Sequence, residues 1–235
     1  MIAAAPGTMR VMNAIDVVPD WRPQSFGSKR ADAIRDPIVE PLWSGLRFLG
    51  AVADDHAILQ DVDGEPLDGL PAMAEALIDA VGGIGVIVDG YVTAELATDG
   101  TGTFTGGVTD PAARVTTRNL VGVRPGSDEQ RLDKGQAARM PRAEDPVALV
   151  LVDLLWLDGE PLLDIPLLER RRQLESVITE TDLVRCGIFV RPPIDTWVGS
   201  WRAMGFPGLS FKSANGRYSP GAPAPDWASV AMPRR

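Results

Sequence analysis

An apolar run at residues 147–156 constrains the fold of this chain more than any other feature of its sequence. The only charged residue in the run is Asp153, and an apolar segment of this length predicts a strand at the centre of a sheet. Asp158-Gly159 then turns the chain, and leucines at helical spacing predict a helix over residues 166–179. With 235 residues and 45% hydrophobic content, the chain can bury a core around such a sheet.

Further strands and helices are predicted on both sides of this run. Residues 47–53 and 57–61 read as two short strands joined at an acidic tip, and residues 71–81 have the apolar spacing of a helix. Residues 86–94 form a β-branched strand that carries Asp89. Later short strands are predicted at 189–192, 208–211 and 227–232. Because strands and helices mix without a regular β-α-β alternation, we expect an α+β fold with antiparallel sheets.

Segments of low periodicity divide the chain. Residues 1–35 contain several prolines and predict an irregular leader laid over a single domain at residues 36–235. Residues 98–107 and 122–146, rich in glycine, threonine and scattered charges, predict long loops or weak hairpins.

The charge balance limits the partners of the chain. It has 23 basic residues against 32 acidic ones, a net charge of -9, and its only lysines are Lys29, Lys134 and Lys212. A protein that grips a phosphate backbone neutralises phosphates with lysine and arginine, so we expect weak DNA binding or none. The run of charges at residues 169–172 predicts a solvated helix face.

Single cysteine and histidine residues exclude several kinds of site. Cys186 has no partner for an internal disulfide, which fits a reducing, cytoplasmic location, and no long apolar segment predicts a membrane span. His56 is the only histidine, which disfavours a Ser-His-Asp mechanism and excludes a multi-histidine metal site. The carboxylate pairs Asp54-Asp55 and Asp89 with Asp153 are the remaining candidates for a divalent ion, although such pairs are more often solvated. We expect no metal site.

Residues 39–49 carry the most specific motif of the chain. They read Val-Glu-Pro-Leu-Trp-Ser-Gly-Leu-Arg-Phe-Leu, which resembles the nucleotidyltransfer motif Glu-Pro-Lys-Trp-Asp-Gly-x-Arg of ATP-dependent DNA ligases. Leu42 stands where that family has its nucleophilic lysine, and Ser44 stands where it has an aspartate. Four further segments resemble later motifs of the family in the same order, at residues 87–92, 151–171, 207–212 and 218–231.

The resemblance implies a fold and a place for a ligand. The family's adenylation domain has the nucleotidyltransferase fold shared with mRNA capping enzymes, in which helices flank two antiparallel sheets and ATP binds between them. The likeness is strongest to the compact bacterial ligases and implies a role in DNA repair. Larger ligases continue into an OB-fold domain, and we expect none in this chain.

The departures from the family pattern fall on its site residues. Tyr91 replaces a carboxylate, Pro207 replaces a glutamate, and Ser229 and Ala231 replace two lysines, in addition to the changes at Leu42 and Ser44. Four residues survive as candidate nucleotide contacts: Glu40, Arg47, Asp89 and Lys212. For Arg47, Asp89 and Lys212 the alternative is a role in structural ion pairs. Adenylyl transfer needs an amine nucleophile, cations for the phosphates and carboxylates for the metal. No catalytic residue of the family is intact in this sequence.

Three hypotheses follow from this pattern. The first is a catalytically inactive ligase-like domain that acts by binding another protein. The second is a nucleotidyltransferase that uses a lysine from elsewhere, with Lys29 and Lys212 as candidates. The third is a nucleotide or DNA-end sensor built on Arg47 and Lys212, with ATP and Mg²⁺ as ligands if any nucleotide binding survives.

Overall fold

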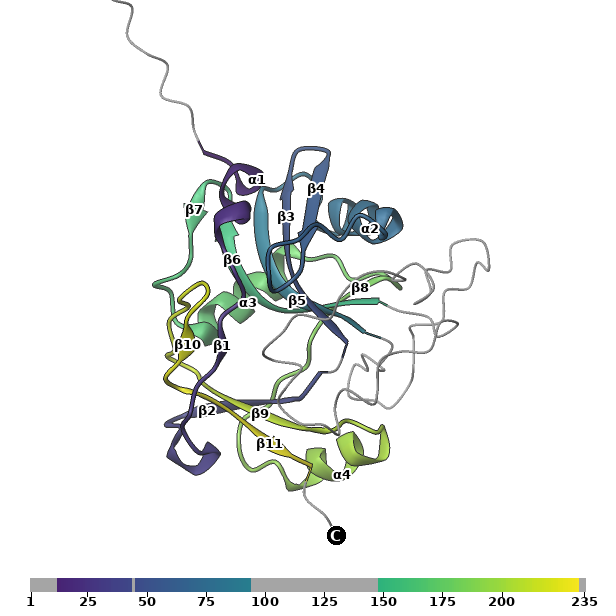
Figure 1. The fold of residues 1–235 in the computed structure, drawn as a ribbon. Helices are drawn as coiled ribbons and strands as arrows, with labels where there is room; N and C mark the ends of the chain where they lie inside the picture. The colour runs from purple at the N-terminus through teal and green to yellow at the C-terminus, as the bar shows by residue number, and fades with distance from the viewer. Residues whose placement is uncertain (1–11, 44, 94–147, 233–235) are drawn as a thin grey trace, which may run out of the picture.

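The computed structural model describes residues 12–43, 45–93 and 148–232, which form two main sheets and one short strand pair (Figure 1). The predicted loops at residues 98–107 and 122–146 lie outside the described residues. An α+β fold with antiparallel sheets was expected, and the structure confirms it.

The large sheet has the strand order β4-β3-β5-β6-β7, and β8 pairs with β6 as well. All of its neighbours run antiparallel except β6 and β8, which are parallel. Its strands are β3 (Leu46–Ala53), β4 (His56–Gln60), β5 (Val86–Thr93), β6 (Ala148–Leu157), β7 (Glu160–Pro161) and β8 (Val184–Cys186). The apolar run at residues 147–156 corresponds to β6, a central strand buried along almost its whole length, as predicted.

The small sheet is antiparallel, with the order β11-β9-β2. It comprises β2 (Pro37–Pro41), β9 (Gly208–Ser213) and β11 (Trp227–Ala231). In Figure 1 the small sheet lies below the large sheet, beside helix α4 (Asp195–Ala203). The chain passes from the small sheet to the large one between β2 and β3, at the motif of residues 39–49.

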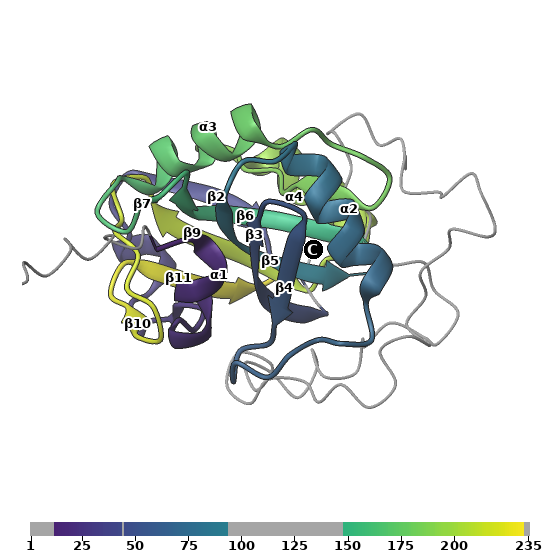
Figure 2. The same cartoon turned by 90° about the horizontal axis from the view of Figure 1, so that it is seen from above.

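Two longer helices cover one face of the large sheet (Figure 2). Helix α2 (Pro71–Val81) begins at a proline, where the missing N–H costs nothing, and ends at Gly82, whose φ of 61° suits glycine. Helix α3 (Leu167–Val177) follows Pro166. Leu77 of α2 and Leu174 of α3 join the same core as Val88 of β5. The sequence predicted both helices.

Residues 12–35 contain only short elements. These are α1 (Ala14–Val17), a 3-10 turn at Val18–Asp20, β1 (Ser25–Phe26) and a second 3-10 turn at Ala31–Ala33. The side-chain amide of Gln60 donates hydrogen bonds to the carbonyls of Val18 and Trp21, at 2.9 and 2.7 Å. Strand β1 pairs in parallel with β10 (Pro223–Ala224). This segment is therefore attached both to the large sheet and to the C-terminal part of the chain.

Three sequence predictions were wrong or incomplete. Residues 189–192 form no strand but a single bridge between Val190 and Val39, because proline has no N–H to donate to a ladder. Helix α4 and the three-residue β8 were not predicted, since both are short. The charge run at residues 169–172 is not one solvated face: Arg170 and Arg171 are fully buried, while Glu169 and Arg172 remain exposed.

Within the described part of the chain, no helix is long and apolar enough to cross a membrane.

Candidate functional site

Leu42, which the motif of residues 39–49 aligns with the family's nucleophilic lysine, lies between β2 and β3. Its side chain is buried, and its backbone N–H donates to the carbonyl of Gly208 at 2.9 Å. A Cβ added to Gly208 would lie only 3.2 Å from Leu42 Cδ2, so the leucine packs directly on β9. An alkyl side chain in this position has no atom that can attack a phosphate. Ser44 lies outside the described residues.

Glu40 and Lys212 form a buried ion pair on the small sheet. Glu40 lies on β2 opposite Ser210 of β9, which places Lys212 diagonally across from it. Lys212 Nζ is 2.7 Å from Glu40 Oε2, and the Ser210 hydroxyl donates to the same oxygen at 3.2 Å. Lys212 and Glu40 are 3% and 1% exposed, so each charge depends on the other for compensation.

Arg47 and Asp89 form a second buried pair, on the large sheet. The Arg47 guanidinium donates from Nε to Asp89 Oδ1 at 3.0 Å and from Nη2 to Oδ2 at 2.8 Å. This fork geometry uses both oxygens of the carboxylate. The hydroxyl of Tyr218 adds a third hydrogen bond to Asp89, at 2.7 Å, and itself accepts the backbone N–H of Gln24 at 2.9 Å. Burial, followed by the nearby Asp89 carboxylate, raises the pKa of Tyr218 well above its usual value, so the phenol remains a neutral donor.

Trp227 of β11 lies between these two pairs. Its ring centroid is 4.4 Å from Lys212 Nζ and 5.8 Å from the guanidinium carbon of Arg47. Both separations suit a cation–π contact. The indole is almost fully buried and also packs edge-on against Tyr218, with centroids 6.0 Å apart. The Trp227 ring of the small sheet thereby contacts the cation of both ion pairs, one on each sheet.

Asp153 of β6 forms a separate ion pair with Arg170. Asp89 and Asp153 are paired in register on neighbouring strands, yet Asp153 accepts two hydrogen bonds from Arg170 of α3, at 2.8 and 2.7 Å. Burial alone would lower the pKa of Arg170, but the Asp153 carboxylate outweighs it and the net shift is upward.

The two carboxylates are therefore not available as ligands for a divalent ion. Asp89 and Asp153 were candidates for such a site, but each carries a bidentate arginine instead. Among the described residues, no group of three or more histidine, cysteine, aspartate or glutamate side chains could hold a metal. In the other candidate pair, Asp55 is 86% exposed in its side chain and lies beside the exposed His56.

The other altered positions of the motifs lie on both sheets. Ala231 pairs with Gly208 across the small sheet, and the N–H of Met232 donates to the carbonyl of Pro207 at 2.8 Å. Leu42, Pro207 and Ala231 are thus gathered at one end of the small sheet. Ser229 lies further along β11, opposite Ser210, and Tyr91 lies on β5 of the large sheet.

Apolar side chains from both sheets meet beside these positions. Val39 and Leu209 of the small sheet share a cluster with Val150 and Val152 of the large sheet, and the half-buried Tyr91 packs against it. The same cluster includes the aromatic residues Trp43, Trp201 and Phe206. Trp43 and Phe206 meet edge to face, with centroids 5.0 Å apart. The sheets are joined here by apolar packing between side chains.

The sequence grouped the four surviving residues as candidate nucleotide contacts, with structural ion pairs as the alternative for Arg47, Asp89 and Lys212, but it did not predict which residues pair. Lys212 lies with Glu40, and Arg47 lies with Asp89, as two internal pairs. The roles of Tyr218 and Trp227 were not predicted, and no local signal distinguishes a buried phenol donor from an ordinary core tyrosine. Gln24, in the predicted leader, was also missed.

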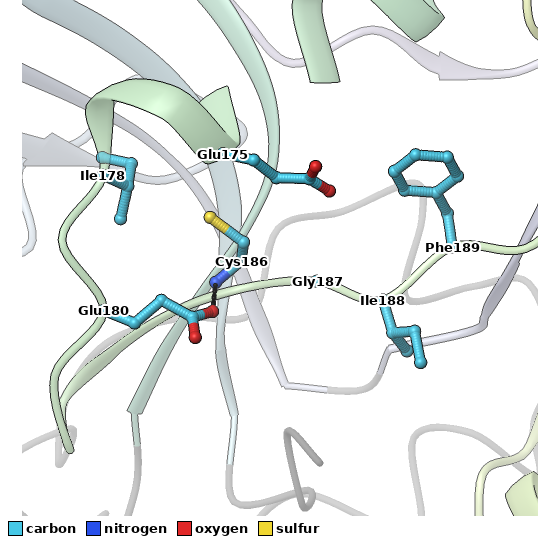
Figure 3. A pocket seen from close by; sticks show the side chains of 7 residues that line it. All are labelled: Glu175, Ile178, Glu180, Cys186, Gly187, Ile188 and Phe189. Carbon is cyan, nitrogen blue, oxygen red and sulfur yellow. Dashed lines mark hydrogen bonds between the residues drawn. The ribbon is translucent and has the colours of Figure 1, made fainter. Parts of the chain in front are cut away.

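A separate pocket of about 450 Å³ lies at the end of α3, beside β8 (Figure 3). Its lining residues are Glu175, Ile178, Glu180, Cys186, Gly187, Ile188 and Phe189. Burial raises the pKa of the Cys186 thiol to about 12; Arg171 opposes this shift, while Glu180 and Glu175 add to it. A thiol with this pKa is a poor nucleophile near neutral pH.

Comparisons with known proteins agree with this architecture. A model of the family described as "ATP dependent DNA ligase domain" matches residues 115–230. A probable DNA ligase of Streptomyces avermitilis is 30% identical over 167 residues, which cover 69% of this chain and 28% of that protein. A DNA ligase of Aeropyrum pernix is 43% identical over 70 residues, or 29% of this chain and 12% of that protein.

Solved structures show the same fold at low sequence identity. The mycobacterial DNA ligase D complexed with ATP and MES matches with a TM-score of 0.62 and 17% identity, over 91% of this chain and 60% of that one. The ligase domain of M. tuberculosis LigD gives a TM-score of 0.58 and 20% identity over the same shares. The matched part of this chain spans less than a third of the curated relatives' length and about three fifths of these two structures.

Proposed function

Because the chain is a relative of the ATP-dependent DNA ligases and has the fold of their adenylation domain, we propose that it is a catalytically inactive adenylation domain that acts by binding another protein. The observation that carries this proposal is the buried pairing of Lys212 with Glu40, two residues before the alkyl side chain that the motif aligns with the nucleophile. Adenylyl transfer requires a neutral amine aimed at the α-phosphate of ATP, and Leu42 supplies none.

The surviving charges support the same conclusion. A residue that holds a phosphate or a ribose needs its polar atoms directed toward the ligand. Arg47 and Lys212 each use theirs on a buried carboxylate of the same chain, at 2.8 and 2.7 Å. Freeing either cation for a ligand would leave a buried carboxylate without its partner, at a cost of about 3–5 kcal/mol.

The carboxylates support it as well. Metal-assisted phosphoryl transfer depends on acidic side chains that hold Mg²⁺ near the phosphates. The acidic positions of the family motifs carry other residue types at Tyr91 and Pro207, and Asp89 is held by Arg47 and Tyr218. The residues present therefore do not fit ATP with its metal ion.

A nucleotidyltransferase that uses a different lysine is less well supported. The Lys212 ammonium group is 2.7 Å from a carboxylate, and removing its proton would dissolve a buried ion pair. Lys29 is exposed, and a solvated lysine lacks the burial or cationic neighbours that activate a nucleophilic amine. The sensor hypothesis needs Arg47 and Lys212 available to a ligand, so their pairing weakens it too.

Binding to another protein is the role that does not require the residues that are substituted at the family's site positions. The net charge of -9 disfavours a DNA-wrapping surface, while a folded domain with an intact core can serve as a docking unit. A place in DNA repair and a cytoplasmic location, both expected from the sequence, stay predictions.

Intact-mass spectrometry after incubation with ATP and Mg²⁺ tests the loss of catalysis. The proposal predicts a single mass, that of the unmodified chain, and an active ligase serves as the positive control for the reagents. An AMP adduct would overturn the proposal, and peptide mapping of that adduct would identify the lysine that carries it.

A further inference from the structure

The pocket beside α3 and β8 is lined by two glutamates and by apolar side chains. Figure 3 shows the side chains of Ile178 and Cys186 near each other at one end, and the Glu175 carboxylate directed toward Phe189. Ile188 continues the apolar lining. Its volume of about 450 Å³ falls within the range of clefts that hold ligands, roughly 300–1,000 Å³.

Two carboxylates face this pocket, and they differ in how firmly they are engaged. Glu180 Oε1 accepts the backbone N–H of Cys186 at 2.8 Å, and Glu180 Oε2 lies 3.6 Å from Arg185 Nη1. The exposed side chain of Glu175 has no hydrogen bond or ion pair with any other residue in the described ranges. One acidic group of the lining is thus available to a ligand.

A buried cation, Arg171, lies behind the wall of the pocket. Arg171 is fully buried behind the wall, where it donates hydrogen bonds to the carbonyls of Leu151 and Gly187. Its guanidinium carbon is 5.0 Å from the centroid of the Phe189 ring. A ligand entering from solvent therefore meets the carboxylates and the apolar side chains before it meets this charge.

We propose that this pocket binds an arginine or lysine side chain, with an apolar residue next to it, from an extended segment of a partner protein. The cationic group would pair with Glu175, and the apolar neighbour would pack on Ile188 and Phe189. Charge complementarity favours a basic partner, because the whole chain carries a net charge of -9. This inference rests on the proposed role in protein binding and names the chemistry of the partner segment.

A titration of the nitrogen-15-labelled full chain with a capped peptide, Gly-Leu-Arg-Leu-Gly, tests the proposal by NMR. We expect chemical-shift changes centred on the backbone amides of residues 186–189. Glu175→Gln keeps the size of the side chain and removes its charge, and we expect it to weaken binding roughly three- to tenfold. Glu169→Gln is the matched control, since Glu169 lies on the same helix but does not line the pocket, and it should leave the affinity unchanged.

Two companion peptides separate charge from apolar packing. We expect no binding when glutamate replaces arginine in the peptide, and weaker binding when alanine replaces both leucines. Absence of shifts at residues 186–189 up to millimolar peptide would overturn the proposal, as would equal affinities of the two glutamine variants. Free arginine methyl ester binding as tightly as the peptide would also contradict it, because the apolar walls would then contribute nothing. These results do not depend on adenylation, so failure here and failure of the proposed inactivity are distinguishable.

Discussion

Lys212 Nζ lies 2.7 Å from Glu40 Oε2, and both side chains are almost fully buried. A surface lysine could be exchanged at little cost, but this one neutralises an acid that water does not reach. Lys212 therefore has a structural role in the buried interior, although lysine is a residue type that ligases use for chemistry.

Breaking this pair is expected to destabilise the fold. Lys212→Met leaves the Glu40 charge buried without its partner, which should cost about 3–5 kcal/mol in the free energy of unfolding. Adding Glu40→Gln removes the stranded charge, so we expect the double variant to regain most of that loss. Urea denaturation measures both effects.

The exposed pair of Arg191 and Asp36 provides a control, because both side chains are about half exposed. Arg191→Met should change the stability by no more than about 1 kcal/mol. A Lys212→Met variant as stable as this control would contradict the structural role of Lys212.

Arg47 and Tyr218 should be energetically coupled through Asp89, since both donate to that carboxylate. We expect Arg47→Met and Tyr218→Phe to be non-additive, with a coupling free energy of about 0.5–3 kcal/mol. A double-mutant cycle measured by chemical denaturation checks this. Strict additivity would show that the three side chains do not act as one network.

Cys186 should react slowly with alkylating reagents, because burial raises the pKa of its thiol to about 12. The thiolate is the reactive form, so the rate of iodoacetamide modification should stay low at pH 8 and rise only toward strongly alkaline pH. The unfolded chain has an ordinary thiol pKa of ~8.5, and it therefore loses this proton at lower pH than the folded chain.

The sign of the linked stability effect follows from that difference. Cys186 favours the unfolded state as the pH rises above ~8.5, so its contribution to folding stability declines toward pH 12. Cys186→Ser should show a smaller loss of stability over the same range. A fast reaction at pH 8 in the folded chain would contradict the raised pKa.

Restoring the nucleophile alone should not restore activity. Leu42→Lys introduces an amine, but the residue packs on Gly208. The positions that the motifs align with the family's metal-binding and phosphate-binding residues, Tyr91, Ser229 and Ala231, remain altered. We expect no covalent adenylate on this variant, since groups that act as a unit give little when only one of them is present. Mass spectrometry of the variant after incubation with ATP and Mg²⁺ provides the check, and an adduct at the introduced lysine would show that the rest of the site still works.

The fold could be predicted from the sequence where hydrophobic periodicity is strong. The apolar run became β6, and the helix expected at residues 71–81 has those bounds in the structure. Prediction failed where partners distant in sequence decide the outcome. Arg170 and Arg171 looked solvated on charge alone, but Asp153 and backbone carbonyls of the sheet hold them inside.

The sequence motifs indicated candidate site residues, but they did not indicate how those residues contact one another. The sequence indicated Glu40, Arg47, Asp89 and Lys212 as candidate nucleotide contacts and left structural ion pairs open for the last three. Their mutual pairing depends on strand register, which brings Lys212 diagonal to Glu40 and Arg47 near Asp89. No local pattern reveals that register, and the same holds for Trp227 between the two pairs.

Incubation of the unaltered chain with radiolabelled ATP and Mg²⁺, followed by denaturing electrophoresis, tests the central claim most directly. The account predicts no label on the protein under conditions in which an active ATP-dependent DNA ligase is labelled. A labelled band that survives denaturation at the mass of this chain would contradict it.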